Sequence, residues 1–194
     1  MDWGFLTSLI LIAVSLTTFA IVTGVSLGHF ARKDGIIPTG SIIIMLAAVA
    51  SVAVFAWCAW TAPLWLLPPL PLYAASLALF IWTVRATRQR QFLLAFTNAV
   101  PSALTIDGPY KFVRHPFYVS YLIYHFANAV GTASWLPWVM FAAMTTIYTV
   151  AARGEEAFLA QGSYAKEYGA YRRRTGMFVP KFWLSPSAGN TSSL

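Results

Sequence analysis

Three long stretches without any Asp, Glu, Lys or Arg constrain this chain more than any other feature of its sequence. They cover residues 3–31, 35–84 and 115–152. A bilayer core about 30 Å thick needs about 20 apolar residues per helix, so the stretches have room for one, two and two spans respectively. Only 10% of the residues are charged, against about 25% in an ordinary soluble domain. The sequence therefore predicts an all-α, integral membrane helical bundle.

We expect five transmembrane helices and a cytoplasmic C-terminal helix, all within a single domain over residues 1–184. The N-terminal apolar run is too long for the hydrophobic region of a signal peptide, so it is interpreted as a retained helix. Residues 185–194 read SPSAGNTSSL and are predicted to form a disordered tail. The expected spans are residues 5–28, 41–62, 64–84, 117–131 and 135–152.

The basic residues predict the orientation of the bundle. If the N-terminus lies outside, all thirteen Lys and Arg residues fall on one side of the membrane. The positive-inside rule makes that side, which includes the C-terminus, cytoplasmic, and we expect a bacterial inner (cytoplasmic) membrane protein. Orientation and contact with anionic membrane lipids account for the net charge of +7, so no nucleic-acid partner is expected.

A polar segment, GPYKFVRHPFYVSY, covers residues 108–121 and directly precedes the fourth expected span. A Gly-Pro turn opens it, and Pro116 restricts the preceding His115 to extended geometry. The segment is therefore expected to be irregular and to hold its polar side chains beside the bilayer, an arrangement that suits a charged ligand. In an alternative interpretation, Lys111 and Arg114 only anchor the chain at the membrane interface.

A second polar group, Arg153 with Glu155 and Glu156, follows the fifth expected span. Paired carboxylates there could bind a ribose, an amino group or a cationic sulfonium through charge-assisted hydrogen bonds. Alternatively, they begin the C-terminal helix, where acidic residues in the first turn interact favourably with the helix dipole. The three histidines lack the close helical spacing of a zinc motif, so no metal site is predicted.

The order of these motifs resembles that of one family. GPYKFVRHPFY, a helical hairpin, EE, EY..Y and a late VP are similar to the signature of the isoprenylcysteine carboxyl methyltransferase and phospholipid methyltransferase superfamily, over about residues 100–182. Members are integral membrane enzymes that transfer a methyl group from S-adenosylmethionine to a lipophilic acceptor. The resemblance implies this cofactor, a lipophilic small-molecule or lipid substrate, and a cytoplasmic cofactor pocket.

The resemblance also implies roles for individual residues. The loop before the motif contacts the cofactor largely through its backbone, and a glutamate of the EE pair binds it from the other side of the pocket. Glu155 is the first choice for this role and Glu156 the second. Glu156, His115 and Arg153 are assigned to the catalytic step. If the acceptor is an amine or a thiol, the proton acceptor is expected to be His115, His125 or a glutamate. The residues expected to bind the cofactor are Ser102, Ala103, Leu104, Thr105, Tyr110, His115, Pro116, Phe117, Tyr118 and Glu155.

One departure from the family pattern leaves the acceptor open. The family commonly places a substrate-binding arginine four residues before the cofactor-binding glutamate, where this chain has Ala151 or Ala152, and the nearest arginine is Arg153. The acceptor could be a prenylated thiol or cysteine carboxylate, a phospholipid amine, a small thiol, or a quinone-like or isoprenoid oxygen. A nicotinamide-dependent membrane reductase and a catalytically degenerate scaffold are the alternatives from other classes. The oligomeric state is open.

Overall fold

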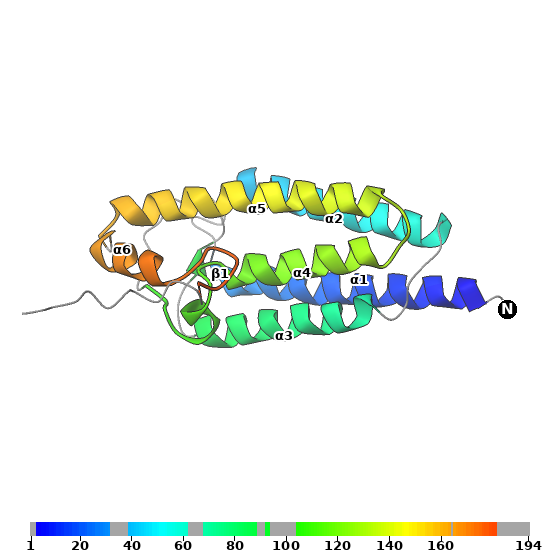
Figure 1. Cartoon of the computed structure of the whole chain (residues 1–194), viewed down its shortest axis with the longest axis horizontal. Helices are drawn as coiled ribbons and strands as arrows, with labels where there is room; N and C mark the ends of the chain where they lie inside the picture. The colour runs from blue at the N-terminus through cyan, green and yellow to red at the C-terminus, as the bar shows by residue number, and fades with distance from the viewer. Residues whose placement is uncertain are drawn as a thin grey trace, which may run out of the picture.

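The computed structural model describes residues 3–31, 39–61, 68–88, 92–93, 104–163 and 165–181. Within these residues, long helices run side by side and a short helix lies at one end of the bundle (Figure 1). The helices are α1 (Trp3–His29), α2 (Thr39–Thr61), α3 (Pro69–Thr87), α4 (Pro116–Val130), α5 (Leu136–Gln161) and α6 (Ala165–Arg174). The predicted all-α bundle is confirmed.

A pair of short strands joins the segment after α1 to the segment after α3. Strand β1 (Phe30–Ala31) pairs in parallel with β2 (Phe92–Leu93), and the 3-10 helix η2 (Gly108–Lys111) lies shortly before α4. These elements gather at the end of the bundle where α1, α3 and α5 end and α2 and α4 begin (Figure 1). The helices thus alternate in direction, as the orientation argument requires.

Three of the helices are long and apolar enough to cross a membrane by length and composition: α1, α2 and α3. Helices α4 and α5 correspond to the fourth and fifth expected spans, but α4 has only 15 residues and α5 carries charged residues near its end. The number of five spans therefore remains a prediction. Proline opens α4 at Pro116, where its missing N–H and fixed φ are suited to a first helical turn.

Helix α5 continues well beyond the expected end of the fifth span. It runs unbroken from Leu136 to Gln161, because the residues after Ala152 are mostly good helix formers and the next break comes at Gly162. The alternative interpretation of Glu155 and Glu156 as the first turn of the C-terminal helix is therefore wrong. They lie near the end of α5, and the C-terminal helix is α6. The predicted tail, residues 185–194, lies outside the described residues.

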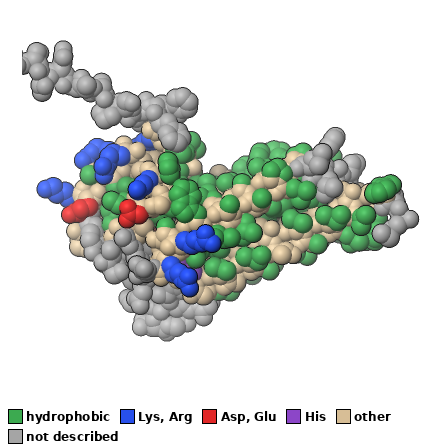
Figure 2. All heavy atoms as spheres, turned by 90° about the horizontal axis from the view of Figure 1, so that it is seen from below, with side chains coloured by type: hydrophobic (Ala, Val, Ile, Leu, Met, Phe, Trp, Pro, Cys, Tyr) green, Lys and Arg blue, Asp and Glu red, His purple; other side chains and the backbone are tan. Residues whose placement is uncertain are grey.

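Two clusters of buried side chains hold the bundle together. In the first, Leu11 of α1, Phe55 of α2, Tyr73 of α3 and Tyr124 of α4 meet between these four helices. In the second, Tyr118, Met144 and Tyr148 join α4 and α5 to α2. On the face shown in Figure 2, hydrophobic side chains cover the elongated part and charged side chains gather toward one end. Hydrophobic exposure of this kind along helices is expected where lipid surrounds them.

Exposed tryptophans lie at the end of the bundle opposite β1, β2 and η2. Trp57 and Trp60 lie in the last turns of α2, and Trp135 and Trp138 lie at the start of α5; between 44% and 70% of each residue is exposed. These helix ends lie at the same end as the start of α1 (Figure 1). Tryptophan is enriched where a helix meets the membrane interface. Their common level supports the prediction that the α4–α5 hairpin reaches the same membrane face as α1 and α2.

Candidate active site

The candidate site lies at the end of the bundle opposite these tryptophans, where the loop after η2 enters α4. Gly108, the first residue of η2, has a φ of 60°, a conformation that glycine adopts without steric cost. A Cβ at this position would also lie 2.9 Å from the Cβ of Ala86. The loop is therefore folded tightly onto the end of α3. His115 occupies the position just before α4 with φ −125° and ψ 63°.

Arg114 is a buried link between three segments. Its Nε donates to Glu156 Oε1 at 2.7 Å and its Nη2 donates to Glu156 Oε2 at 3.2 Å. Its Nη1 donates to the carbonyl oxygens of Thr175 and, at 3.4 Å, of Arg172, at the end of α6. The carbonyl end of a helix attracts a cation. Arg114 is therefore not an exposed interface anchor, whereas Lys111 is exposed and fits that interpretation.

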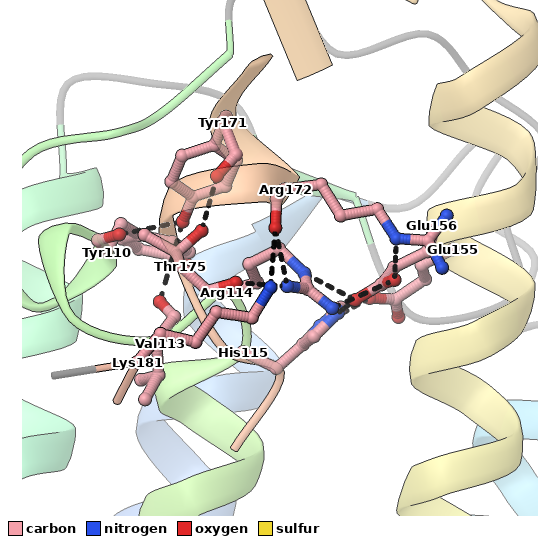
Figure 3. A network of polar contacts seen from close by, with 10 residues as sticks. All are labelled: Tyr110, Val113, Arg114, His115, Glu155, Glu156, Tyr171, Arg172, Thr175 and Lys181. Atoms are coloured by element: carbon pink, nitrogen blue, oxygen red, sulfur yellow. Dashed lines mark hydrogen bonds and ion pairs between the residues drawn. The ribbon is translucent and has the colours of Figure 1, made fainter. Parts of the chain in front are cut away.

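His115 lies between two carboxylates (Figure 3). Its Nε2 is 3.1 Å from Glu156 Oε1 and its Nδ1 is 3.4 Å from Glu155 Oε2. Burial alone would lower the pKa of His115, but the hydrogen bonds and negative charges of both glutamates outweigh burial and raise it. The two glutamates therefore favour the imidazolium form of the ring, in which both nitrogens are donors.

The two adjacent glutamates differ in their surroundings. Glu156 is 3% exposed, and besides Arg114 and His115 it has Arg172 Nε at 3.5 Å. Burial would raise the pKa of Glu156, but hydrogen bonds and charges from His115 and Arg114 lower it to about 2. The Glu155 side chain is 34% exposed, and its Oε1 accepts a hydrogen bond from the Tyr118 hydroxyl at 2.6 Å. Glu156 is thus an internal ion-pair partner, and Glu155 is the glutamate accessible to a ligand.

The segment after α6 forms one wall of the site. The backbone N–H of Arg114 donates to the carbonyl of Gly176 at 2.8 Å, and that of His115 donates to the carbonyl of Met177 at 3.2 Å. A Cβ on Gly176 would lie only 1.7 Å from the carbonyl oxygen of Val179. The turn at this position therefore requires glycine. The late Val-Pro of the sequence motif lies just after this glycine, and the resemblance implied that the C-terminal segment forms part of the pocket, but it named no residue of this wall.

Aromatic rings continue from the charged groups into the bundle. The ring of His115 stacks on Tyr118 with centroids 5.6 Å apart, and Tyr118 stacks in turn on Tyr148 at 5.2 Å. Phe178, from the segment after α6, meets His115 edge-on at 6.1 Å. The charged cluster therefore adjoins an aromatic side, which can accept an apolar group.

Several residues predicted from the sequence do meet here. His115, Tyr118, Glu155 and Glu156 form the cluster, and the buried Pro116 opens α4 beneath it. Phe117, by contrast, packs against Phe80 of α3 and His29 of α1. Tyr110 is buried beside the cluster, where its carbonyl accepts a hydrogen bond from Tyr171 at 2.7 Å.

The remaining predicted residues lie farther out or cannot be placed. Thr105 is buried and Leu104 is partly buried, whereas Ser102 and Ala103 lie outside the described residues. Arg153 is exposed on α5, and among the described residues the arginines bound to Glu156 are Arg114 and Arg172 instead.

Sequence reasoning missed two residues of α6, Tyr168 and Arg172. They are one helical turn apart, so they share a face of the helix. Tyr168 is 2% exposed, and its hydroxyl has no hydrogen-bond partner among the described residues. The available signal in the sequence was the EY..Y motif followed by three arginines. Without the fold, nothing showed which of these tyrosines and arginines belongs to the site.

His125 lies away from this cluster, in the interior of the bundle. Its Nδ1 is 3.0 Å from the hydroxyl of Ser51 on α2, and its Nε2 is 3.5 Å from that of Tyr148. Within the described part of the chain, no group of three or more His, Cys, Asp and Glu residues is placed to hold a metal ion.

Residues 64–167 match the phospholipid methyltransferase family. The chain belongs to this family. The resemblance inferred from the RHPFY and EE motifs is thereby confirmed, and family membership together with the three long apolar helices identifies an integral membrane protein. The matched range includes the whole of α3, α4 and α5, and so includes both glutamates.

Among curated proteins, this phospholipid methyltransferase family member is similar to methanethiol S-methyltransferases. It is 38% identical over 83 residues to methanethiol S-methyltransferase 1 of Bradyrhizobium diazoefficiens, a match covering 43% of this chain and 28% of that protein. It is 37% identical over 95 residues to the Pseudomonas sp. enzyme and 31% identical over 93 residues to that of Crocosphaera subtropica. Each of these matches covers 47% of this chain and 35% of the relative, so about a third of each relative's length is matched.

Proposed function

We propose that this protein transfers a methyl group from S-adenosylmethionine to a small lipophilic thiol at the cytoplasmic face of the membrane. The observation that carries this proposal is the cluster of His115, Glu155 and Glu156 beside the aromatic side of the α4–α5 hairpin. The family and the names of the three relatives support the reaction and the thiol acceptor.

The residues of the cluster fit the proposed cofactor. S-adenosylmethionine carries a sulfonium, an ammonium and a carboxylate, and it therefore needs both an acceptor carboxylate and hydrogen-bond donors. Glu155 offers a partly exposed carboxylate, and Tyr118 presents an aromatic ring next to it. When bound, the cofactor supplies an electrophilic methyl group.

The chain's own residues prepare this site. Arg114 fixes Glu156, and the imidazolium of His115 donates to both glutamates, so their orientation is set before a ligand arrives. While it is paired in this way, His115 has no free lone pair with which to accept a proton. His125 lies inside the bundle against Ser51. Neither histidine is therefore free to accept the proton of a thiol, and the acceptor enters the reaction as its thiolate.

The aromatic side gives an apolar acceptor a place beside the charged cluster. Tyr118 and Tyr148 are buried and stacked on each other between α4 and α5, so the side of the site toward the bundle is aromatic and suits an apolar thiol. Excluding water at this point strengthens electrostatic interactions with the reacting groups. A phospholipid amine is the second acceptor, and the name of the matched family favours it.

A binding and turnover experiment on the purified protein in detergent tests the proposal. We expect saturable binding of S-adenosylhomocysteine, and methyl transfer from labelled S-adenosylmethionine to methanethiol that exceeds transfer to a phospholipid amine or a prenylated cysteine. Glu155→Ala and His115→Ala should each lower S-adenosylhomocysteine affinity by at least about 10-fold, because each removes a charged hydrogen bond from the site.

Glu167→Ala is the matched control, since Glu167 is an exposed carboxylate on α6. It should bind S-adenosylhomocysteine like the wild type. Wild-type protein that stays folded but binds no S-adenosylhomocysteine would refute the proposal, and binding with transfer only to the phospholipid would replace the thiol by the amine.

A further inference from the structure

The charges around Glu156 are not balanced. Three cations, Arg114, Arg172 and the imidazolium of His115, surround two carboxylates, and Glu156 alone contacts all three. Arg172 makes the longest of these contacts, 3.5 Å, and makes it through Nε. Among the described residues, its two terminal nitrogens have no partner, and 58% of its side chain is exposed. Glu156 is therefore satisfied without Arg172, which retains free donors.

Glu155 is the negative counterpart of this free cation. It is adjacent to Glu156 on α5 and is 34% exposed, against 4% for the side chain of Glu156. Arg172 extends from α6 toward the two glutamates (Figure 3). An accessible guanidinium and an accessible carboxylate thus lie next to each other. An α-amino acid, which carries a carboxylate and an ammonium on the same carbon, has the complementary pair of charges.

Tyr168 adds an independent observation beneath Arg172. Tyr168 lies one helical turn before Arg172 on the same face of α6, and burial raises its pKa. The residue is 2% exposed, and the hydroxyl lacks a partner among the described residues. A buried polar group without a hydrogen bond is costly. The Tyr168 hydroxyl is therefore a hydrogen-bond donor without a partner among the described residues, one helical turn before Arg172.

We propose that Arg172 and Glu155 bind the zwitterionic amino-acid group of the cofactor, with Arg172 taking the carboxylate, supported by the Tyr168 hydroxyl, and Glu155 taking the ammonium. This inference rests on the proposed function and makes it more specific, because it assigns the junction of α5 and α6 to one end of S-adenosylmethionine. Arg153, which the resemblance assigns to the catalytic step, has no part in this assignment.

Truncating the ligand tests the assignment. S-adenosylhomocysteine has the amino-acid group, whereas 5′-methylthioadenosine has the adenosine and the thioether without it. In the full-length protein in detergent, Arg172→Gln should weaken S-adenosylhomocysteine binding by about 10- to 100-fold, the effect of one charged hydrogen bond. The affinity for 5′-methylthioadenosine should stay within about twofold of wild type, since that ligand lacks the group that Arg172 binds. Glu155→Gln should show the same selectivity, and Tyr168→Phe a smaller loss.

Arg173→Gln is the matched control, because Arg173 is the neighbouring exposed arginine of α6. It should leave both affinities unchanged. Retained 5′-methylthioadenosine binding also shows that Arg172→Gln is folded. Equal losses for both ligands, or no loss for either, would overturn the inference. If Arg172 only contacts lipid, Arg172→Gln and Arg173→Gln should equally weaken binding to anionic vesicles and spare S-adenosylhomocysteine. Wild-type protein that binds neither nucleoside would instead refute the proposed function.

Discussion

Among the described residues, two of the buried polar networks differ in their chemistry. The network at the end of the bundle is charged, with Arg114 and His115 bound to Glu156. The network inside the bundle is neutral. There Asn128 Oδ1 accepts hydrogen bonds from the Tyr73 hydroxyl at 2.6 Å and from the Ser15 hydroxyl at 3.0 Å, so that α1, α3 and α4 are joined at one point.

The difference follows from the position of each network relative to the bilayer. A charge inside the hydrocarbon is costly, so the helices of the predicted spans are joined by hydroxyl and amide groups. At the end of the bundle, opposite charges can be paired and remain accessible to ligands on one side. The neutral network therefore fixes the helices relative to one another, and the charged network builds the site on them.

Breaking the charged network should have the largest effect on stability. Glu156→Ala leaves Arg114 buried without its carboxylate, and such a loss typically costs about 3 to 5 kcal/mol. We expect a large drop in the thermal unfolding midpoint in detergent, together with loss of S-adenosylhomocysteine binding. Glu167→Ala, which removes an exposed carboxylate, should change the free energy of unfolding by less than about 0.5 kcal/mol. Equal effects of the two substitutions would contradict the importance of the Arg114 pair.

Breaking the neutral network should have a smaller effect. Asn128→Ala removes the acceptor of two interhelical hydrogen bonds, and interhelical bonds in membranes contribute about 0.6 kcal/mol on average and about 1.7 at most. We expect a loss of about 1 to 2 kcal/mol, measured by the same unfolding assay, with S-adenosylhomocysteine affinity retained. Thr145→Ala is the control, because the Thr145 hydroxyl bonds within its own helix to the carbonyl of Phe141. A loss of cofactor binding in Asn128→Ala would show that the two networks are not separable.

The smallest effect should be a dependence of stability on pH that only the charged network shows. Because the pKa of His115 is raised from 6.5 in the folded protein, its contribution is complete below about pH 6.5 and is lost as the pH rises through the raised value. The lowered pKa of Glu156 acts oppositely, so its contribution is lost as the pH falls from about 4.5 toward about 2.

His115→Gln keeps a polar side chain but cannot be protonated. Its unfolding midpoint should therefore lose the alkaline decline that the wild type shows, whereas Asn128→Ala should keep it. A wild-type midpoint that stays constant as the pH rises from neutral would contradict the imidazolium.

The sequence predicted the charged network better than the neutral one. His115, Glu155 and Glu156 stood out as charged groups in an apolar chain, and the motif order assigned them to one site. Ser15, Asn128 and the tyrosines are common inside membrane helices, and only tertiary packing shows that they meet. The role of Arg114 also depended on the fold, because its partners lie at the ends of α5 and α6.

The spans were predicted from the absence of charge, a criterion that does not tell where a helix ends. The fifth expected span ends at Ala152, before Arg153, whereas α5 continues to Gln161. A charged residue ends an apolar stretch but does not break a helix. Glu155 and Glu156 therefore lie on the same continuous helix as the residues of the fifth expected span. The location of Arg172 beside them required the turn between α5 and α6, which no motif predicted.

The pairing of Val113 with Gly176 also bears on the order in which the protein matures during synthesis. Chains leave the ribosome from the N-terminus, and their domains fold as the necessary segments emerge. The apolar helices can enter the membrane early, but the backbone partners of Arg114 and His115 are Gly176 and Met177, which are translated more than sixty positions later. A chain that stops before Thr175 would therefore leave an inserted bundle without the backbone partners of Arg114 and His115.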